Sequence, residues 1–201
     1  MKKKIIGLGI LLVIGVGGFV IGKPYYDLHF TTIDLSESEK VFYIPSGSSL
    51  ADVGQILESN AILNGDKFQN YAAKLDFTEE KVEAGKYKAS SGMKIKELVY
   101  ALKNGNQEIK DITVTFNNCQ YIEEMAGKVA PSIEADSTEL VDYIKNPETI
   151  SKYGFKNETM IALFLPDTYE VGEWDMSAEE FVEFMAEQFK SFWNDEGTGR
   201  G

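Results

Sequence analysis

The stretch VFYIPSGSSLADVGQIL, residues 41–57, decides the fold of the first part of the chain. After Lys40, residues 41–44 are β-branched or aromatic, which is typical of a strand, and Pro45 ends the run. Residues 49–52, SLAD, have the spacing of a capping box, in which a serine hydroxyl accepts a hydrogen bond from the amide three residues further on. Apolar residues then recur at helical spacing: Leu50, Val53, Ile56 and Leu57. This stretch therefore predicts a strand that leads into an amphipathic helix.

The pattern of residues 46–57 recurs at residues 91–102, at an offset of 45 residues. A second helix around residues 68–75 and a returning strand at residues 85–89 lie between the two copies. We therefore expect a module of strand, helix, helix and strand with two related strand-to-helix corners. The alternative is coincidence between two amphipathic helix starts. Two copies are too few for a solenoid.

A second part of the chain begins near residue 109. Residues 112–116 alternate in polarity with the period of a half-buried strand. Helices are predicted from residue 122 and from the cap residue Asp136, with a break at residues 146–147. Residues 160–164 are apolar and predict a short buried strand that leads into a turn-like loop at residues 166–169. A helix capped by Ser177 follows, with acidic residues on one face and an aromatic stripe on the other. The predicted fold class is α+β.

The amino-acid composition argues against several kinds of partner and of catalytic chemistry. The 201 residues carry a formal net charge of −12, which argues against nucleic acid as a partner because phosphate binding needs a basic surface. Cys119 and His29 are the one cysteine and the one histidine, so no Cys/His cluster for zinc exists and we expect no metal and no cofactor. His29 follows the apolar run at residues 5–21 by only a few residues, so we expect this one imidazole to lie at the membrane surface and not beside a catalytic nucleophile. We interpret Cys119 as a partly buried thiol. The side chains that remain as candidates for catalysis are carboxylates.

Residues 5–21 form an uncharged run rich in Ile, Leu and Val, preceded by three lysines and followed by Lys23. As a helix the run spans roughly 26 Å, close to the hydrocarbon core of about 30 Å. A cleaved signal peptide is the alternative, but the run is long for one and no Ala-x-Ala site follows it. We predict a transmembrane anchor at residues 1–23 in the plasma (inner) membrane, with a cytoplasmic N-terminus and the bulk of the chain outside the cytoplasm. A polar linker is predicted at residues 24–39.

Several segments resemble a known family when taken in order. Residues 43–50, YIPSGSSL, resemble the start of a LysM-like module, a fold associated with glycans that contain N-acetylglucosamine. Residues 83–87, EAGKY, and residues 164–169, FLPDTY, follow. Together with the predicted anchor, they resemble the endolytic murein transglycosylases, also called the YceG-like family. The resemblance implies a LysM-like module at residues 40–108 and the N-terminal part of a catalytic domain at residues 109–201.

The resemblance also implies a substrate and a reaction. Its members are expected to cleave the β-1,4 bond between N-acetylmuramic acid and N-acetylglucosamine with a 1,6-anhydro product, by a glutamate that acts as acid and then base. The implied partners are peptidoglycan glycan strands, the membrane and, beyond these, proteins of wall synthesis. The implied substrate-binding residues are Asn117, Asn118, Asp167, Thr168 and Tyr169.

The family's catalytic glutamate lies in an Ile-x-Glu-Lys-Glu type sequence beyond the position of Tyr169, and no such sequence is present here. Ile161-Ala162 also stands where many members have Glu-Gly. We therefore assign no catalytic residue and expect that the chain stops before the catalytic glutamate and is inactive as it stands. The alternative is a non-catalytic envelope protein that binds peptidoglycan through its LysM-like module.

Overall fold

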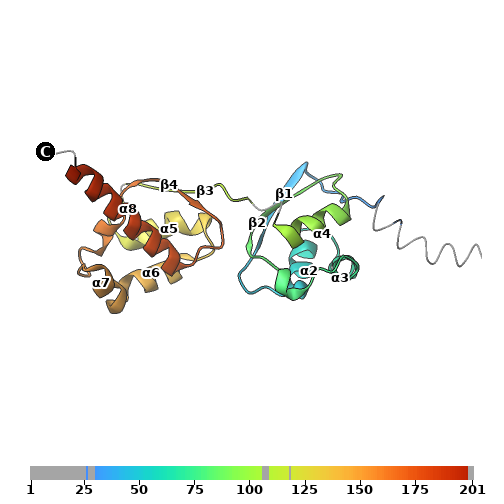
Figure 1. Ribbon diagram of the computed structural model, residues 1–201, viewed down its shortest axis with the longest axis horizontal. Coiled ribbons are helices and arrows are strands. Elements are labelled where there is room, and N and C mark those ends of the chain that lie inside the picture. The colour runs from blue at the N-terminus through green and yellow to red at the C-terminus, as the bar shows by residue number, and fades with distance from the viewer. Residues whose placement is uncertain (1–25, 27–29, 106–108, 118, 199–201) are drawn as a thin grey trace, which may run out of the picture. The chain divides into compact units, whose positions relative to one another are not determined.

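The computed structural model of the protein describes residues 26, 30–105, 109–117 and 119–198. They divide into two units, Met1–Glu83 with Tyr87–Glu108, and Ala84–Lys86 with Ile109–Gly201 (Figure 1). Each unit has its own hydrophobic core. Both combine helices with a two-stranded sheet, so the fold class is α+β as predicted.

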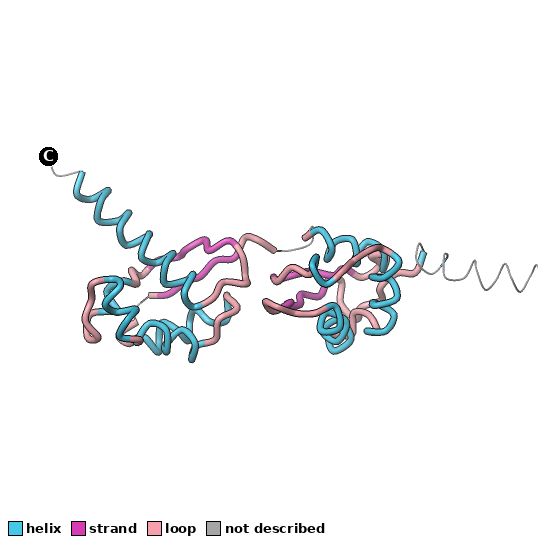
Figure 2. Tube along the Cα trace, turned by 60° about the horizontal axis from the view of Figure 1, so that its bottom comes forward, coloured by secondary structure: helices cyan, strands magenta, loops and turns pink. Residues whose placement is uncertain are grey.

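The first unit has the predicted order of elements. Strand β1 (Glu39–Ile44) leads into helix α2 (Leu50–Ser59), which is followed by α3 (Gly65–Lys74), strand β2 (Gly85–Ser90) and α4 (Ile95–Asn104). The two strands lie beside each other in one sheet (Figure 2). Helix α2 packs against β1 and α3, and α3 packs against α4. The core is built from the apolar faces of all five elements.

The two strand-to-helix corners have similar geometry. Each contains a glycine in the left-handed region, Gly47 with φ +74° and Gly92 with φ +84°. At the first corner the Asp52 amide donates to Ser49 Oγ at 3.2 Å, and the Ser49 amide donates to Asp52 Oδ2 at 2.8 Å, which completes the predicted capping box. At the second corner the Lys94 amide donates to Glu97 Oε2 at 3.1 Å. The similarity at residues 46–57 and 91–102 therefore extends from sequence to backbone geometry.

The last part of the predicted linker differs from expectation, because residues 31–38 belong to the first unit. Ile33 is 3% exposed and lies in the core. Its amide donates to the Met93 carbonyl at 2.7 Å, and its carbonyl accepts from the Gly92 amide at 2.8 Å. The polar residues around Ile33 suggest a linker, but one apolar side chain and backbone pairing with a distant turn are sufficient to fix the segment.

The second unit is built around two antiparallel strands, β3 (Ile112–Phe116) and β4 (Asp167–Gly172). Between them in the chain lie α5 (Ile122–Val129), α6 (Ser137–Lys145) and α7 (Pro147–Tyr153), and α8 (Ala178–Thr198) follows β4. Helix α5 packs against β3 and α6, and α8 packs against α6. Asp136 caps α6 as predicted, since its Oδ1 accepts from the amides of Thr138 and Glu139 at 2.7 and 2.9 Å.

The prediction for residues 160–169 is wrong in both halves. Met160–Leu163 is a 3₁₀ helix and not a strand, while β4 begins at Asp167, where we expected a loop. A short apolar run fits a helix or a strand equally well, so its period cannot decide between them. The strand forms because residues 167–172 pair with β3, a contact across about fifty residues of sequence that local patterns do not show.

Helix α8 has the predicted cap and apolar face. The Glu180 amide donates to Ser177 Oγ at 3.3 Å, and Phe181 and Met185 are fully buried. Further along, Phe192 is 44% and Trp193 is 56% exposed. The C-terminal turns of α8 extend beyond the other elements of this unit (Figures 1 and 2). The aromatic stripe therefore has packing partners in its first half and an exposed second half.

The predicted transmembrane segment at residues 5–21 and His29 lie outside the residues that the structure describes. Among those it does describe, no helix combines the length and apolar character needed to cross a bilayer.

Candidate functional site

The pairing of β3 with β4 places the FLPDTY segment. Phe116 pairs with Asp167, Thr115 with Thr168 and Val114 with Tyr169. Because side chains alternate along a strand, Asp167 and Tyr169 share one face of β4 while Thr168 lies on the other. Thr168 Oγ1 lies 2.9 Å from Thr115 Oγ1 on the exposed face.

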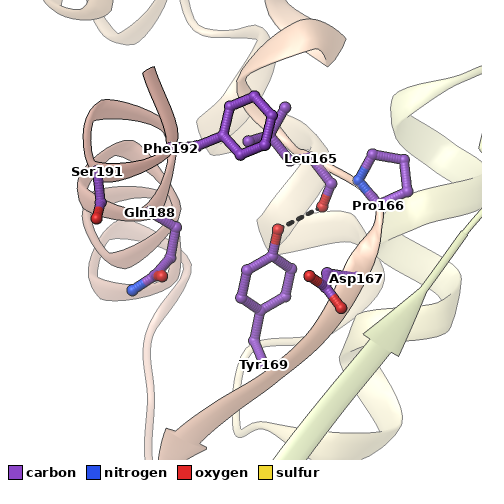
Figure 3. Close-up of a pocket in the computed structure, with 7 residues that line it drawn as sticks. All are labelled: Leu165, Pro166, Asp167, Tyr169, Gln188, Ser191 and Phe192. Atoms are coloured by element: carbon purple, nitrogen blue, oxygen red, sulfur yellow. Dashed lines mark hydrogen bonds between the residues drawn. The ribbon is translucent and has the colours of Figure 1, made fainter. Parts of the chain in front are cut away.

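Three contacts hold the Tyr169 side chain in place. Its hydroxyl donates to the Leu165 carbonyl at 2.6 Å (Figure 3). Its ring stacks on Phe116 with centroids 5.6 Å apart, and its edge meets Phe184 of α8 at 6.0 Å. Burial, together with the nearby Asp167 carboxylate, raises the pKa of Tyr169 above its usual value of 10.0. The resemblance implies that Tyr169 binds substrate, but in the folded chain its hydroxyl and its ring make these three contacts within the protein.

An open groove of about 610 Å³ lies between the start of β4 and helix α8. Helix α8 contributes three side chains at the spacing of one helical face (Figure 3). The complete lining is Leu165, Pro166, Asp167, Tyr169, Gln188, Ser191 and Phe192. The groove therefore combines a carboxylate, an amide and two hydroxyl groups with apolar and aromatic walls, a mixture typical of sites for small polar ligands.

The structure brings two of the five predicted site residues into this groove, Asp167 and Tyr169. Thr168 faces away from it. Asn117, at the end of β3, is exposed and does not line the groove, and its carbonyl accepts from Lys128 Nζ at 2.6 Å. Asn118 lies outside the described residues.

Besides Leu165 and Pro166, three lining residues on α8 were absent from the predicted set: Gln188, Ser191 and Phe192. Their positions i, i+3 and i+4 on a predicted helix were a usable signal, since they share a face. Nothing in the sequence shows that this face meets the start of β4, because that contact is made only in the folded unit.

A second cavity of about 440 Å³ adjoins the groove and shares Leu165 and Pro166 with it. Its walls are almost wholly apolar. The remaining lining residues are Phe116, Cys119, Met125, Ile161, Ala162, Phe164, Phe189 and Trp193. Cys119 is half-buried there, and its thiol lies 3.4 Å from the Asn117 carbonyl, in agreement with a partly buried thiol. Ile161 and Ala162 also line this apolar space.

Acidic residues gather elsewhere, around a hollow of about 300 Å³ at the end of β4. Burial is the main cause that raises the pKa of Asp175 above its usual value of 3.8, and the nearby carboxylates of Glu173, Glu134 and Glu180 add to it. The pKa of Glu180 is lowered, because the amide and hydroxyl of Ser177 donate to its carboxylate. Within the described ranges, no three His, Cys, Asp or Glu side chains are grouped closely enough to hold a metal ion.

Comparison with known proteins identifies the class to which this α+β chain and its FLPDTY groove belong. The model of the YceG-like family matches residues 42–200. The chain therefore belongs to the YceG-like family.

Two individual proteins are similar to this chain. The endolytic murein transglycosylase of Bacillus subtilis (strain 168) is 24% identical over 199 residues, which cover 90% of this chain and 52% of that protein. The chain thus spans about half the length of this curated relative. A solved YceG-like protein from Listeria monocytogenes is 20% identical, with a TM-score of 0.37 over 81% of this chain and 58% of that chain.

Proposed function

We propose that this chain acts on peptidoglycan as part of an endolytic murein transglycosylase, and that its own residues bind the glycan strand. The observation that carries the proposal is the match to the YceG-like family over residues 42–200, supported by the name of the Bacillus subtilis relative. The groove between β4 and α8 is consistent with it. Sugars present hydroxyl groups at their edges and C–H groups on their faces, and the groove offers polar and aromatic partners for both.

The reaction that we propose for such a transglycosylase needs a carboxylic acid in apolar surroundings. The acid donates a proton to the oxygen that links N-acetylmuramic acid to N-acetylglucosamine, and the C6 hydroxyl of the muramic acid attacks C1. That hydroxyl then returns a proton to the carboxylate, and a 1,6-anhydro end results. Among the described lining residues of the groove, Asp167 is the one carboxylate, and its side chain is exposed. We therefore propose that this chain binds glycan without cleaving it.

Incubation of the full chain with purified murein tests both halves of this proposal. We expect the chain to sediment with murein and to release no 1,6-anhydro ends detectable by mass spectrometry. A chain that does not sediment with murein contradicts the binding role. Release of 1,6-anhydro ends contradicts the assignment as a non-cleaving part and supports full transglycosylase activity.

A second candidate is a non-catalytic envelope protein that binds peptidoglycan through residues 40–108, a segment we propose to be LysM-like. It is favoured by the first unit, which has its own core and the order β1, α2, α3, β2. Replacing Phe192 in the groove by Ala discriminates between the two. We expect weaker binding to murein if the groove takes part, while unchanged binding favours the first unit as the binding site.

We also propose that residues 5–21 anchor the chain in the plasma membrane, with the three lysines before them in the cytoplasm. Alkaline carbonate extraction of membranes tests the anchor, and protease treatment of intact spheroplasts tests the orientation. Release of the chain by carbonate contradicts the first claim, and protection of the chain from external protease contradicts the second.

A further inference from the structure

The described lining of the groove between β4 and α8 includes a negatively charged residue type and no positively charged one. Among its described lining residues, Asp167 is the one of a charged type. Asp167 Oδ1 accepts from the Thr168 amide at 2.7 Å, which fixes the carboxylate at the start of β4. No ion pair joins Asp167 to a cation of the described residues. A ligand in this groove therefore meets a carboxylate that is held in no ion pair with the described residues.

The two sugars of murein differ in the group to which this charge is sensitive. N-acetylglucosamine is uncharged, whereas N-acetylmuramic acid carries a lactyl ether that ends in a carboxylate when no peptide is attached. Gln188 and Ser191 offer hydrogen-bonding groups that suit an N-acetyl group and hydroxyls, and the Phe192 ring offers a face for stacking. A volume of about 610 Å³ lies within the usual range for small-molecule sites, about 300 to 1,000 Å³.

We infer that the groove takes an N-acetylglucosamine residue and that Asp167 is a specificity-determining residue, which disfavours a sugar with a free carboxylate at this position. This inference rests on the proposed function. Two unit charges about 4 Å apart in a water-like medium repel each other enough to lower affinity roughly fivefold. Because Asp167 is exposed, salt screens this repulsion, and the preference weakens as ionic strength rises.

Binding of three monosaccharides to the full chain tests the inference, because each can place only one kind of sugar in the groove. They are N-acetylglucosamine, N-acetylmuramic acid, and N-acetylmuramic acid with its lactyl carboxylate converted to an amide. Tryptophan fluorescence is the readout, because Trp174 and Trp193, the two tryptophans, both belong to the second unit. Trp193 also contacts Phe192, with ring centroids 5.4 Å apart.

For the wild-type chain at low salt we expect N-acetylglucosamine to bind about fivefold more tightly than N-acetylmuramic acid. Amidation of the lactyl group should remove most of this difference. In Asp167→Asn, which keeps an oxygen for the Thr168 amide, the ratio of the two dissociation constants should fall to about twofold or less. The matched control is Asp142→Asn, an exposed aspartate on α6 that does not line the groove, for which the ratio should stay at the wild-type value.

The outcomes separate this inference from the proposed function. A ratio that does not respond to Asp167→Asn, or equal affinity of the wild type for the charged and the uncharged sugar, overturns the inference and leaves glycan binding in place. Persistence of the preference in the amidated ligand also overturns it, because the lactyl group then acts by its size. Failure of the chain to bind any of the three sugars or whole murein overturns the proposed function as well.

Discussion

The Tyr169 side chain connects β4 with strand β3 and with helix α8. Its hydroxyl is a hydrogen-bond donor to the half-buried Leu165 carbonyl, and its ring lies between Phe116 of β3 and Phe184 of α8. Thr168 and Tyr169 of the FLPDTY segment therefore make different kinds of contact. Thr168 links the two strands on the exposed face, while Tyr169 holds the groove wall together.

Tyr169→Phe should lower the free energy of unfolding of the second unit by about 1 to 2 kcal/mol, because the Leu165 carbonyl loses its donor while the ring contacts remain. Urea unfolding followed by tryptophan fluorescence measures the change. Tyr121→Phe is the control, since its side chain is 57% exposed, and it should change stability by less than about 0.5 kcal/mol. An unaltered midpoint for Tyr169→Phe would show that water replaces the hydroxyl at no cost.

The pKa of Asp175 is raised in the folded chain, which predicts that the stability of the second unit depends on pH. Below the unfolded pKa of 3.8 both states hold the proton, so the residue is neutral in each. Between this value and the higher pKa of the folded chain, the carboxyl is ionised in the unfolded chain and still protonated in the folded chain. The free energy of unfolding therefore falls as pH rises through this range and stays at the lower value above it. Asp175→Asn should therefore stabilise the second unit at pH 7, by less than about 1 kcal/mol because the site is largely solvated.

The gain from Asp175→Asn should disappear near pH 3, where the wild-type carboxyl is also uncharged. Thermal unfolding of both proteins at pH 3 and pH 7 measures it. An equal gain at both values would indicate a cause other than charge, and a loss at pH 7 would contradict the raised pKa.

At the scale of elements, helices α2 and α3 cross at two glycines. A Cβ on Gly65 would lie 3.1 Å from the Gly54 carbonyl oxygen and 3.0 Å from Glu58 Oε2. The Glu58 carboxylate is held by hydrogen bonds from the Gly65 amide at 3.2 Å and from Asn64 Nδ2 at 2.9 Å, and the Gly54 oxygen belongs to the backbone of α2. The close approach of these two helices therefore depends on the absence of a side chain at position 65.

Gly65→Ala should destabilise the first unit by about 1 to 3 kcal/mol, because the two helices must move apart. Gly127→Ala is the matched control in α5 of the second unit, where a Cβ would meet nothing within 4 Å. That change should stabilise the second unit by about 0.5 to 1 kcal/mol, since alanine favours a helix. Far-UV circular dichroism during urea unfolding measures both, and a neutral Gly65→Ala would contradict the crowded crossing.

The elements also show where local sequence patterns succeed and where they do not. The caps at Ser49, Asp136 and Ser177 mark the starts of α2, α6 and α8 correctly, because a cap involves residues only three or four positions apart. Residues 31–38 and β4 were missed. Both segments are held by backbone hydrogen bonds to partners far away in the sequence, and their own composition resembles that of a linker or a turn.

At the scale of the whole molecule, the two cores share no residue. Leu57→Ala should remove about 2 to 5 kcal/mol from the first unit, because Leu57 is completely buried in its core. Circular dichroism should then show an earlier transition, whereas tryptophan fluorescence, which reports on the second unit, should keep its wild-type midpoint. Gln55→Ala, at an exposed position of the same helix, is the control and should alter neither signal by more than about 0.5 kcal/mol. A shift of the fluorescence midpoint with Leu57→Ala would show that the two cores unfold together.

Membership of the YceG-like family was accessible from the sequence, because residues 43–50 and 164–169 carry a local signature that does not depend on folding. The α+β class and most helix boundaries followed for the same reason, since periodicity and caps are short-range properties. The groove required the folded chain. The groove residues of α8 meet Asp167 and Tyr169 only because α8 packs beside the start of β4. These two segments lie about twenty residues apart in the sequence. Their packing is decided by the burial of Phe181 and Met185 of α8 in the core of the second unit.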